Sequence, residues 1–158
     1  MCTLRDYRPG DESAVLALVE AALTPYALPM KLQSTDRDVQ DIKAHYDDRG
    51  GLFRILEDKG RVVGSYGLFP LENGDCELRK MYLLPEYKGR GLGKRLLEEA
   101  LERAPALGFK RVELESNSCL TEAMTLYRRY GFTPYTPDHY SDRCDCAMEL
   151  LLRSPEPD

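Results

Sequence analysis

The sequence predicts a single α/β domain, and three observations support this. Helix-like and strand-like spacings of apolar residues succeed one another along the chain. The 158 residues, 42% of them hydrophobic, suffice for one core without support from a metal or disulfide bonds. A glycine-rich turn at residues 88–93 joins a strand pattern to an amphipathic helix pattern. We therefore expect one domain over residues 1–153 and a polar tail at residues 154–158.

The first third of the chain predicts one strand and two helices. Residues 3–7 alternate like a short strand, and Asp11 can cap the helix that follows. That helix should end near Pro25. A second helix is expected to start at Ser34, after an irregular stretch. Its apolar positions are Val39, Ile42 and Tyr46.

The middle of the chain predicts a hairpin and the strand that leads into the glycine-rich turn. Residues 52–57 and 61–69 flank a turn at 58–60 and have the pattern of an antiparallel hairpin. Residues 76–84 form the next strand pattern. Its alternation breaks down at residues 80–84, as an inserted residue would cause, and this predicts a β-bulge.

Beyond the glycine-rich turn, the chain predicts helix, strand, helix and strand. The first helix should close near Gly108, and residues 110–115 alternate as a strand. Thr121 can cap a helix that stops at Gly131, a residue suited to the left-handed position after a helix. Residues 144–152 place their apolar side chains on one face of a last strand.

Charge is distributed unevenly along the chain. The net charge is −5, yet residues 79–95 carry six cations against the single acid Glu86, which gives +5 and leaves −10 for the rest. An acidic protein with cations around a glycine-rich helix start is suited to a small polyanionic ligand. A nucleic-acid partner is not expected, because no broad basic face is apparent.

The sequence also bears on location. No apolar run reaches the ~18 residues of a membrane span, and the first residues lack the apolar region of a signal peptide. The five cysteines are an odd number without a disulfide framework, which fits a reducing compartment. We expect a cytoplasmic protein without a membrane partner. No metal is expected, because His139, Cys144 and Cys146 do not have a recognised ligand spacing.

The spacing of the glycines distinguishes between phosphate-binding motifs. A P-loop has four residues between its glycines, but Gly89 and Gly93 enclose three. Arg95 stands where Ser or Thr would bind magnesium, so a nucleotide-binding P-loop is disfavoured. A dinucleotide fingerprint would require a third glycine where Lys94 stands.

The segment Lys88-Gly-Arg-Gly91-Leu-Gly93 resembles the acetyl-CoA motif of the GNAT family of N-acetyltransferases, Gln/Arg-x-x-Gly-x-Gly/Ala, with Lys88 in place of Gln or Arg. The resemblance covers nearly the whole chain in element order. It implies a single GNAT-type domain, whose mixed, mostly antiparallel sheet is flanked by helices and splays after the bulge. It also implies acetyl-CoA as cosubstrate. The implied cofactor-binding residues are Met81, Tyr82, Leu83, Lys88, Gly89, Arg90, Gly91, Leu92, Gly93, Lys94 and Asn117.

Two residues are candidates for catalysis. Tyr127 falls on the family's tyrosine that donates a hydrogen bond to the departing CoA sulfur, but it also lies on the apolar helix face as a core residue would. Because a phenol has a pKa of ~10 and a thiol ~8.5, donation to the developing thiolate describes this role better than full proton transfer. Glu77 falls on the catalytic glutamate of the histone-acetylating members. The alternative interpretation of Glu77 is a surface ion pair with Arg79 and no catalytic role.

The resemblance implies direct attack of a primary amine on the thioester, with the backbone of residues 81–83 stabilising the oxyanion. We expect a small-molecule amine or a peptide amino-terminus as the acceptor, and the resemblance allows a homodimer. A cluster of aspartates is most simply a solvated face, although it could attract a cationic acceptor. These aspartates are Asp36, Asp38, Asp41, Asp47 and Asp48.

The alternative function is a non-catalytic acyl-CoA-binding regulatory module.

Overall fold

The computed structural model describes residues 1–153 and contains one seven-stranded sheet with strand order β1-β2-β3-β4-β5-β7-β6. Neighbouring strands are antiparallel except for the parallel pair β4 and β5. The predicted tail at residues 154–158 lies outside the described residues. The strands are β1 Cys2–Asp6, β2 Leu52–Asp58, β3 Arg61–Pro70, β4 Cys76–Leu83, β5 Arg111–Ser116, β6 Thr133–Tyr135 and β7 Cys146–Leu151.

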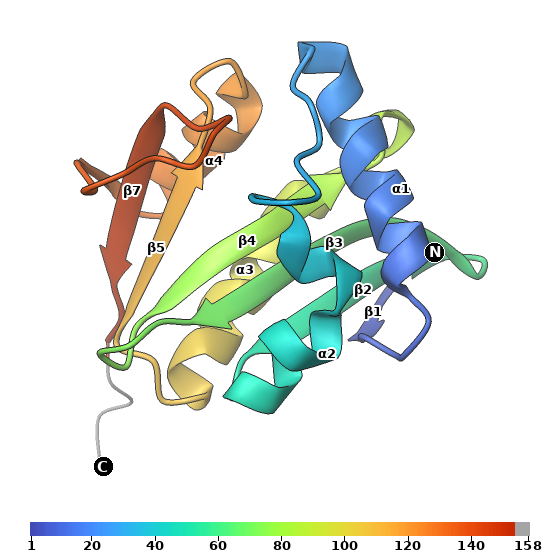
Figure 1. Ribbon diagram of the computed structural model, residues 1–158. Helices are drawn as coiled ribbons and strands as arrows, with labels where there is room; N and C mark the ends of the chain where they lie inside the picture. The colour runs from blue at the N-terminus through green and yellow to red at the C-terminus, as the bar shows by residue number, and fades with distance from the viewer. Residues whose placement is uncertain (154–158) are drawn as a thin grey trace.

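Helices cover both faces of this sheet, with α1 and α2 on one face and α3 on the other (Figure 1). One of two hydrophobic clusters joins α1 and α2 to the sheet, and the other joins α3, α4 and Leu18 of α1 to it. This confirms the prediction of an α/β domain with a mixed, mostly antiparallel sheet. The helices are α1 Glu12–Leu23, α2 Ile42–His45, α3 Leu92–Ala106 and α4 Thr121–Arg129.

The sheet opens between β4 and β5. These strands pair only at Cys76 with Val112 and at Glu77 with Glu113, and beyond this point they diverge (Figure 1). The bulge predicted at residues 80–84 is present in β4. Its register with β3 shifts between Ser65, which faces Tyr82, and Gly67, which faces Arg79.

The prediction of a second helix from Ser34 is wrong. The chain instead forms a 3-10 turn at Arg37–Gln40, the four-residue α2, and a further turn at Asp47–Arg49. Asp41 interrupts the helix with φ −148°, and its carboxylate accepts a hydrogen bond of 3.2 Å from the Ala44 amide. The apolar side chains expected on that helix are nevertheless buried, because the 3-10 turns preserve their common face.

Two predicted helix caps differ from the structure. Asp11 stands at the N-cap of α1 but does not cap it through its side chain: its carboxylate binds the Arg5 guanidinium and makes no capping hydrogen bond. Thr121 does not stand at the N-cap of α4, because it is the first residue of this helix and Leu120 precedes it. The short edge strand β6, which contains Pro134, was not anticipated because a proline disfavours a strand.

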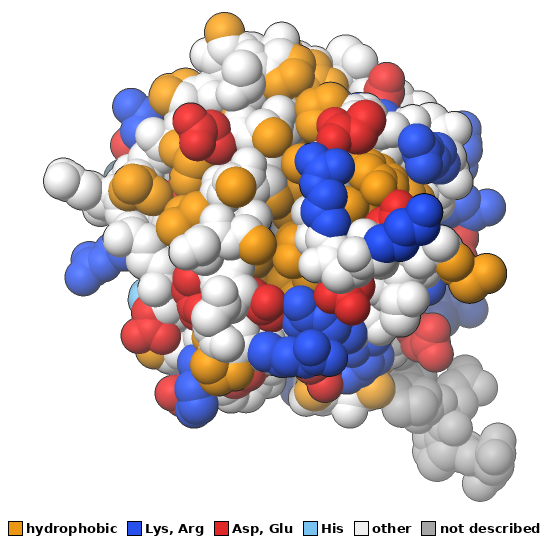
Figure 2. Space-filling view, turned by 90° about the vertical axis from the view of Figure 1, so that its right-hand side faces the viewer, with side chains coloured by type: hydrophobic (Ala, Val, Ile, Leu, Met, Phe, Trp, Pro, Cys, Tyr) orange, Lys and Arg blue, Asp and Glu red, His pale blue; other side chains and the backbone are white. Residues whose placement is uncertain are grey.

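No described helix is long and apolar enough to cross a membrane. Figure 2 shows the face on the right-hand side of Figure 1, where basic side chains occur in small groups beside acidic ones. The residues drawn there do not form a continuous basic surface.

Candidate active site

A cavity of about 720 Å³ lies where β4 and β5 diverge. Its wall combines the β4 bulge, the glycine-rich loop before α3, the loop after β5, one face of α4 and the segment after α1. The cavity therefore brings together residues that are distant in the sequence. The predicted site residues on its wall are Glu77, Met81, Tyr82, Leu83, Lys88, Gly89, Gly91, Leu92, Gly93, Asn117 and Tyr127.

Two predicted cofactor residues are not among those that line the cavity. Arg90 donates a hydrogen bond of 3.1 Å to the Glu86 carbonyl, and its guanidinium stacks 4.7 Å from the centre of the Tyr87 ring. Lys94 is exposed and lies 3.7 Å from the Glu98 carboxylate. Since Glu98 is one turn further along α3, it compensates part of the positive charge that Lys94 brings to the helix start.

The glycine-rich loop leaves the start of α3 open. Gly89 and Gly91 have φ angles of 78° and 76°, a left-handed conformation that glycine adopts without strain, and no atom lies within 4 Å of a Cβ built at either position. Gly93 has a helical backbone. The first amides of a helix have no intrahelical acceptor and carry partial positive charge, so this open helix start fits a phosphate group.

Lys88 occupies the position where the family motif has Gln or Arg. Its ammonium donates a hydrogen bond of 2.7 Å to the Tyr26 hydroxyl and lies 4.7 Å from the centre of that ring. Tyr26 follows α1, so this contact joins the segment after α1 to the glycine-rich loop on the cavity wall.

Tyr127 is buried on the side of α4 that faces the cavity, with 6% of the residue exposed. Burial raises the pKa of its phenol, and nearby Tyr82 and Cys146 raise it further. No described residue hydrogen-bonds to the Tyr127 hydroxyl. The hydroxyl is therefore protonated at neutral pH and retains its proton for donation to a ligand.

Glu77 lies beside the opening of the sheet and accepts a hydrogen bond from Arg79. Burial raises the pKa of Glu77, with smaller contributions from Glu115 and Glu113, and the charge of Arg79 only partly opposes this. The Arg79 guanidinium also packs 3.7 Å from the centre of the Phe69 ring. The ion pair considered in the sequence analysis therefore exists, but in the cavity wall and not on the surface.

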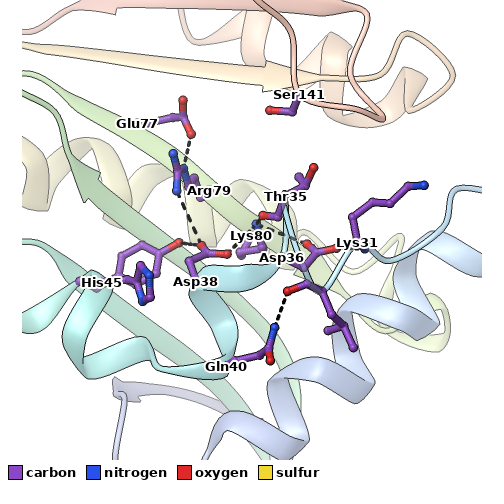
Figure 3. A network of polar contacts seen from close by, with 12 residues as sticks. Lys31, Thr35, Asp36, Asp38, Gln40, His45, Glu77, Arg79, Lys80 and Ser141 are labelled. Carbon is purple, nitrogen blue, oxygen red and sulfur yellow. Dashed lines mark hydrogen bonds and ion pairs between the residues drawn. The ribbon is translucent and has the colours of Figure 1, made fainter.

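A network of buried charges beside the cavity was missed by the sequence analysis (Figure 3). Asp36 is 0% exposed and pairs through both oxygens with Arg143, while Lys80 lies within 3.4 Å of Asp36 and 3.3 Å of Asp38. The prediction of a solvated aspartate face is thus wrong for Asp36 and Asp38. Asp41, Asp47 and Asp48 are exposed, as predicted.

Asn117 lines the cavity, but its amide group is already engaged. Its nitrogen donates a hydrogen bond of 2.9 Å to the Arg143 carbonyl, and its oxygen accepts one of 3.0 Å from the Cys119 amide. These contacts hold the loop after β5 against the loop before β7.

The fold and the cavity together have counterparts among known proteins. The model of the acetyltransferase (GNAT) family matches residues 16–132, and the chain belongs to this family. It is 36% identical over 150 residues to the uncharacterised N-acetyltransferase YjgM of Escherichia coli, which covers 89% of this chain and 88% of that protein. A mycothiol acetyltransferase of Streptomyces griseus is 32% identical, with 86% of this chain and 44% of that protein covered.

Solved structures agree with this assignment. An acetyltransferase from Streptococcus agalactiae superposes with a TM-score of 0.85 at 25% identity, over 96% of this chain and 98% of that one. YncA from Salmonella typhimurium, solved with its cofactor acetyl-CoA, has a TM-score of 0.76 at 22% identity, over 100% and 98% of the two chains, and shows the shared fold. The protein is an acetyl-CoA-dependent N-acetyltransferase.

Proposed function

We propose that the protein transfers the acetyl group of acetyl-CoA to a small primary amine by direct attack. The observation that carries this proposal is the single cavity that joins the glycine-rich loop, the β4 bulge, Glu77 and Tyr127. These groups correspond to the four tasks of the reaction: holding the cofactor, stabilising the oxyanion, removing a proton and supporting the leaving sulfur.

In the proposed reaction, the amides of the loop at residues 88–94 bind the pyrophosphate of acetyl-CoA. The acceptor nitrogen loses a proton to Glu77, directly or through water, and attacks the thioester carbonyl carbon. Backbone amides of residues 81–83 stabilise the oxyanion. The carbon–sulfur bond then breaks, the Tyr127 hydroxyl donates a hydrogen bond to the departing sulfur, and acetylated amine and CoA are released.

We take the end of the cavity between the segment after α1 and the loop before β7 as the acceptor end. Contacts across this end favour a small molecule over a peptide amino-terminus as the acceptor. Ser34 donates a hydrogen bond of 3.1 Å to Asp142, and the buried pair of Arg143 with Asp36 lies beside it. These contacts join the segment after α1 to the loop before β7 across the cavity. A polypeptide entering between them would have to separate the buried pair, and breaking such a pair costs about 3–5 kcal/mol.

Two carboxylates on the cavity wall that have no cationic partner in the described part of the chain favour a cationic amine. Asp36 and Asp38 are already paired with Arg143 and Lys80, so they do not supply the attraction that the sequence analysis assigned to them. Glu77 is likewise paired with Arg79. The carboxylates of Glu115 and Asp142 line the cavity and, among the described residues, accept hydrogen bonds only from Ser141 and Ser34. Their attraction for an ammonium should weaken as the Debye length falls from ~10 Å at 0.1 M salt to ~3 Å at 1 M.

The test is thiol release from acetyl-CoA with a panel of acceptors. The panel contains alkylamines, diamines and amino acids, and tetrapeptides that begin with the same amino acids. We expect turnover with small amines and a much lower kcat/KM with the matched tetrapeptides. Equal turnover of the tetrapeptides would contradict the small-molecule acceptor, whereas CoA binding without turnover of any amine would favour the non-catalytic module.

The cytoplasmic location and the possible homodimer remain predictions from the sequence. Cell fractionation would test the location. Light scattering on the purified protein would test the oligomeric state.

A further inference from the structure

Lys80 adopts a backbone conformation that is unusual for a residue with a side chain. Its φ angle is 55°, in the left-handed region, where the Cβ of an L-residue approaches the following carbonyl. The only other left-handed residues with a side chain in the described part of the chain are Ala27 and Lys59, and both lie in turns. Lys80 instead lies inside β4, at the position where the register with β3 shifts.

Both ends of Lys80 are anchored by buried groups. The Ser65 hydroxyl donates a hydrogen bond of 2.7 Å to the Lys80 carbonyl. The Lys80 ammonium, whose side chain is 4% exposed, donates a hydrogen bond of 2.9 Å to the Thr35 carbonyl and lies within 3.4 Å of both aspartates (Figure 3). A disfavoured conformation persists where surrounding contacts over-determine it, and Lys80 meets this condition.

The two aspartates do not depend on Lys80 equally. Asp36 also has two hydrogen bonds from Arg143 and one of 2.8 Å from the Lys31 amide. Asp38 accepts a hydrogen bond from the Tyr46 hydroxyl through one oxygen, while its other oxygen is buried and has no hydrogen-bond partner among the described residues. The ammonium of Lys80, 3.3 Å away, is the cation nearest to that oxygen. Asp38 therefore needs the charge of Lys80 more than Asp36 does.

The position of Lys80 connects these contacts to the active site. The residues that follow it, Met81 to Leu83, line the cavity and form the part of the bulge to which we assign the oxyanion. A change in the backbone of Lys80 would reorient those amides. The partners of its ammonium, Thr35 and Asp36, belong to the segment that covers the acceptor end.

We propose that Lys80 is a positioning residue, whose ion pairs with Asp36 and Asp38 hold the β4 bulge in the conformation that presents the amides of residues 81–83 to the thioester. This inference rests on the proposed function. Lys80 acts through the backbone that follows it.

The first experiment removes the charge of the Lys80 side chain and keeps its approximate length. Lys80→Met should lower kcat by about 10²-fold, the effect of misplacing a reacting group by roughly 1 Å. The affinity for CoA should change little, because the glycine-rich loop is untouched. Among the described cations, Lys80→Met also leaves Asp38 with only the more distant Arg79 guanidinium, 4.0 Å from its other oxygen, so the loss could arise from general destabilisation. The double variant Lys80→Met, Asp38→Asn removes that weakly paired charge and should recover the Tm.

The double variant separates the two roles. If Lys80 positions the bulge, the double variant has a recovered Tm and a kcat that stays low. If Lys80 only neutralises Asp38, kcat recovers together with the Tm, and the inference is overturned. Lys59→Met is the matched control, since Lys59 is also left-handed but lies in the exposed β2–β3 turn. It should keep the wild-type kcat, and an equal loss there would also overturn the inference.

A second variant tests the same bulge through the Ser65 hydroxyl, its other anchor. This test does not depend on whether the Lys80→Met variant folds. Ser65→Ala removes the hydrogen bond to the Lys80 carbonyl and should lower kcat by about tenfold, which corresponds to one hydrogen bond. CoA affinity should be retained. An unchanged kcat in Ser65→Ala would contradict the proposed role of the anchored bulge. A wild-type protein that acetylates no amine would instead contradict the proposed function.

Discussion

The Phe132 amide donates a hydrogen bond of 3.1 Å to the Tyr127 carbonyl, and the rings of these two residues pack with their centres 5.7 Å apart. Gly131, with φ 97°, lies between them and donates a hydrogen bond of 3.1 Å to the Arg128 carbonyl. This is a Schellman motif, built around the glycine that was expected in the left-handed position after the helix. It fixes the end of α4 and, with it, the orientation of the Tyr127 phenol toward the cavity.

Tyr127→Phe should remove the hydroxyl and keep the ring contact with Phe132. We expect CoA affinity and stability close to wild type and a kcat that falls by about 10²- to 10⁴-fold, the range for a positioned acid. Single-turnover kinetics would measure this. Tyr130→Phe is the control, because that hydroxyl binds Glu98 on the surface. A Tyr127→Phe variant with normal single-turnover rates would reduce Tyr127 to a packing residue.

Gly91→Val should abolish CoA binding. A side chain there occupies the open space at the start of α3, and the left-handed backbone costs a residue with a Cβ roughly 1–2 kcal/mol. Gly60→Val is the matched control, since Gly60 has φ 79° and equally open surroundings in the β2–β3 turn. Both variants should lose similar stability, but only Gly91→Val should lose CoA affinity by calorimetry. Normal CoA binding by Gly91→Val would refute the assignment of the loop.

Features that depend on local sequence were predictable. The β2–β3 hairpin follows from the turn at residues 58–60, and the end of α4 follows from Gly131, because each is specified by a few adjacent residues. The bulge was visible as a break in alternation. The glycine-rich loop was identified by its spacing for the same reason.

The buried charge network was not predictable, because it depends on contacts between distant segments. Asp36 and Arg143 are 107 positions apart, and each is a residue type that usually lies on the surface. Nothing in the neighbourhood of Lys80 indicates that its ammonium is buried. The helix predicted from Ser34 failed for a related reason: Asp36 and Asp38 turn inward to meet these cations, and the backbone follows in short 3-10 turns.

Glu77→Gln should change the pH dependence of turnover. Because burial raises the pKa of Glu77, its carboxylate becomes a competent base only above its ordinary range, so wild-type kcat/KM should rise with pH from above 4.5. Near the pKa of a lysine-like amine, ~10.4, free amine is abundant and the base is no longer needed. The variant should therefore lose activity mainly at neutral pH.

The control for this experiment is Glu72→Gln, which removes a carboxylate from the exposed β3–β4 turn. It should leave the shape of the profile unchanged. A uniform loss across pH in Glu77→Gln would mean that Glu77 serves only as the partner of Arg79.

Asp36→Asn should destabilise the fold in a pH-dependent way. Burial alone would raise the pKa of Asp36, but the hydrogen bonds from Arg143 and from the Lys31 amide, together with the charge of Lys80, lower it below its ordinary value of 3.8. A carboxylate with a depressed pKa contributes stability above its unfolded pKa, and this contribution is lost as pH falls through the folded pKa. At pH 7 the variant should lose about 3–5 kcal/mol, the cost of leaving a buried partner unpaired.

Urea unfolding at pH 7, 5 and 3 would measure this prediction. The difference in the free energy of unfolding between wild type and Asp36→Asn should be constant from pH 7 to 5. It should narrow below about pH 4, where the wild-type carboxylate begins to be protonated in the folded state. Asp142→Asn is the control, because it removes only the exposed contact with Ser34 and should cost at most about 1 kcal/mol. A difference that stays the same down to pH 3 would show that the Asp36 side chain stabilises the fold by packing and not through its charge.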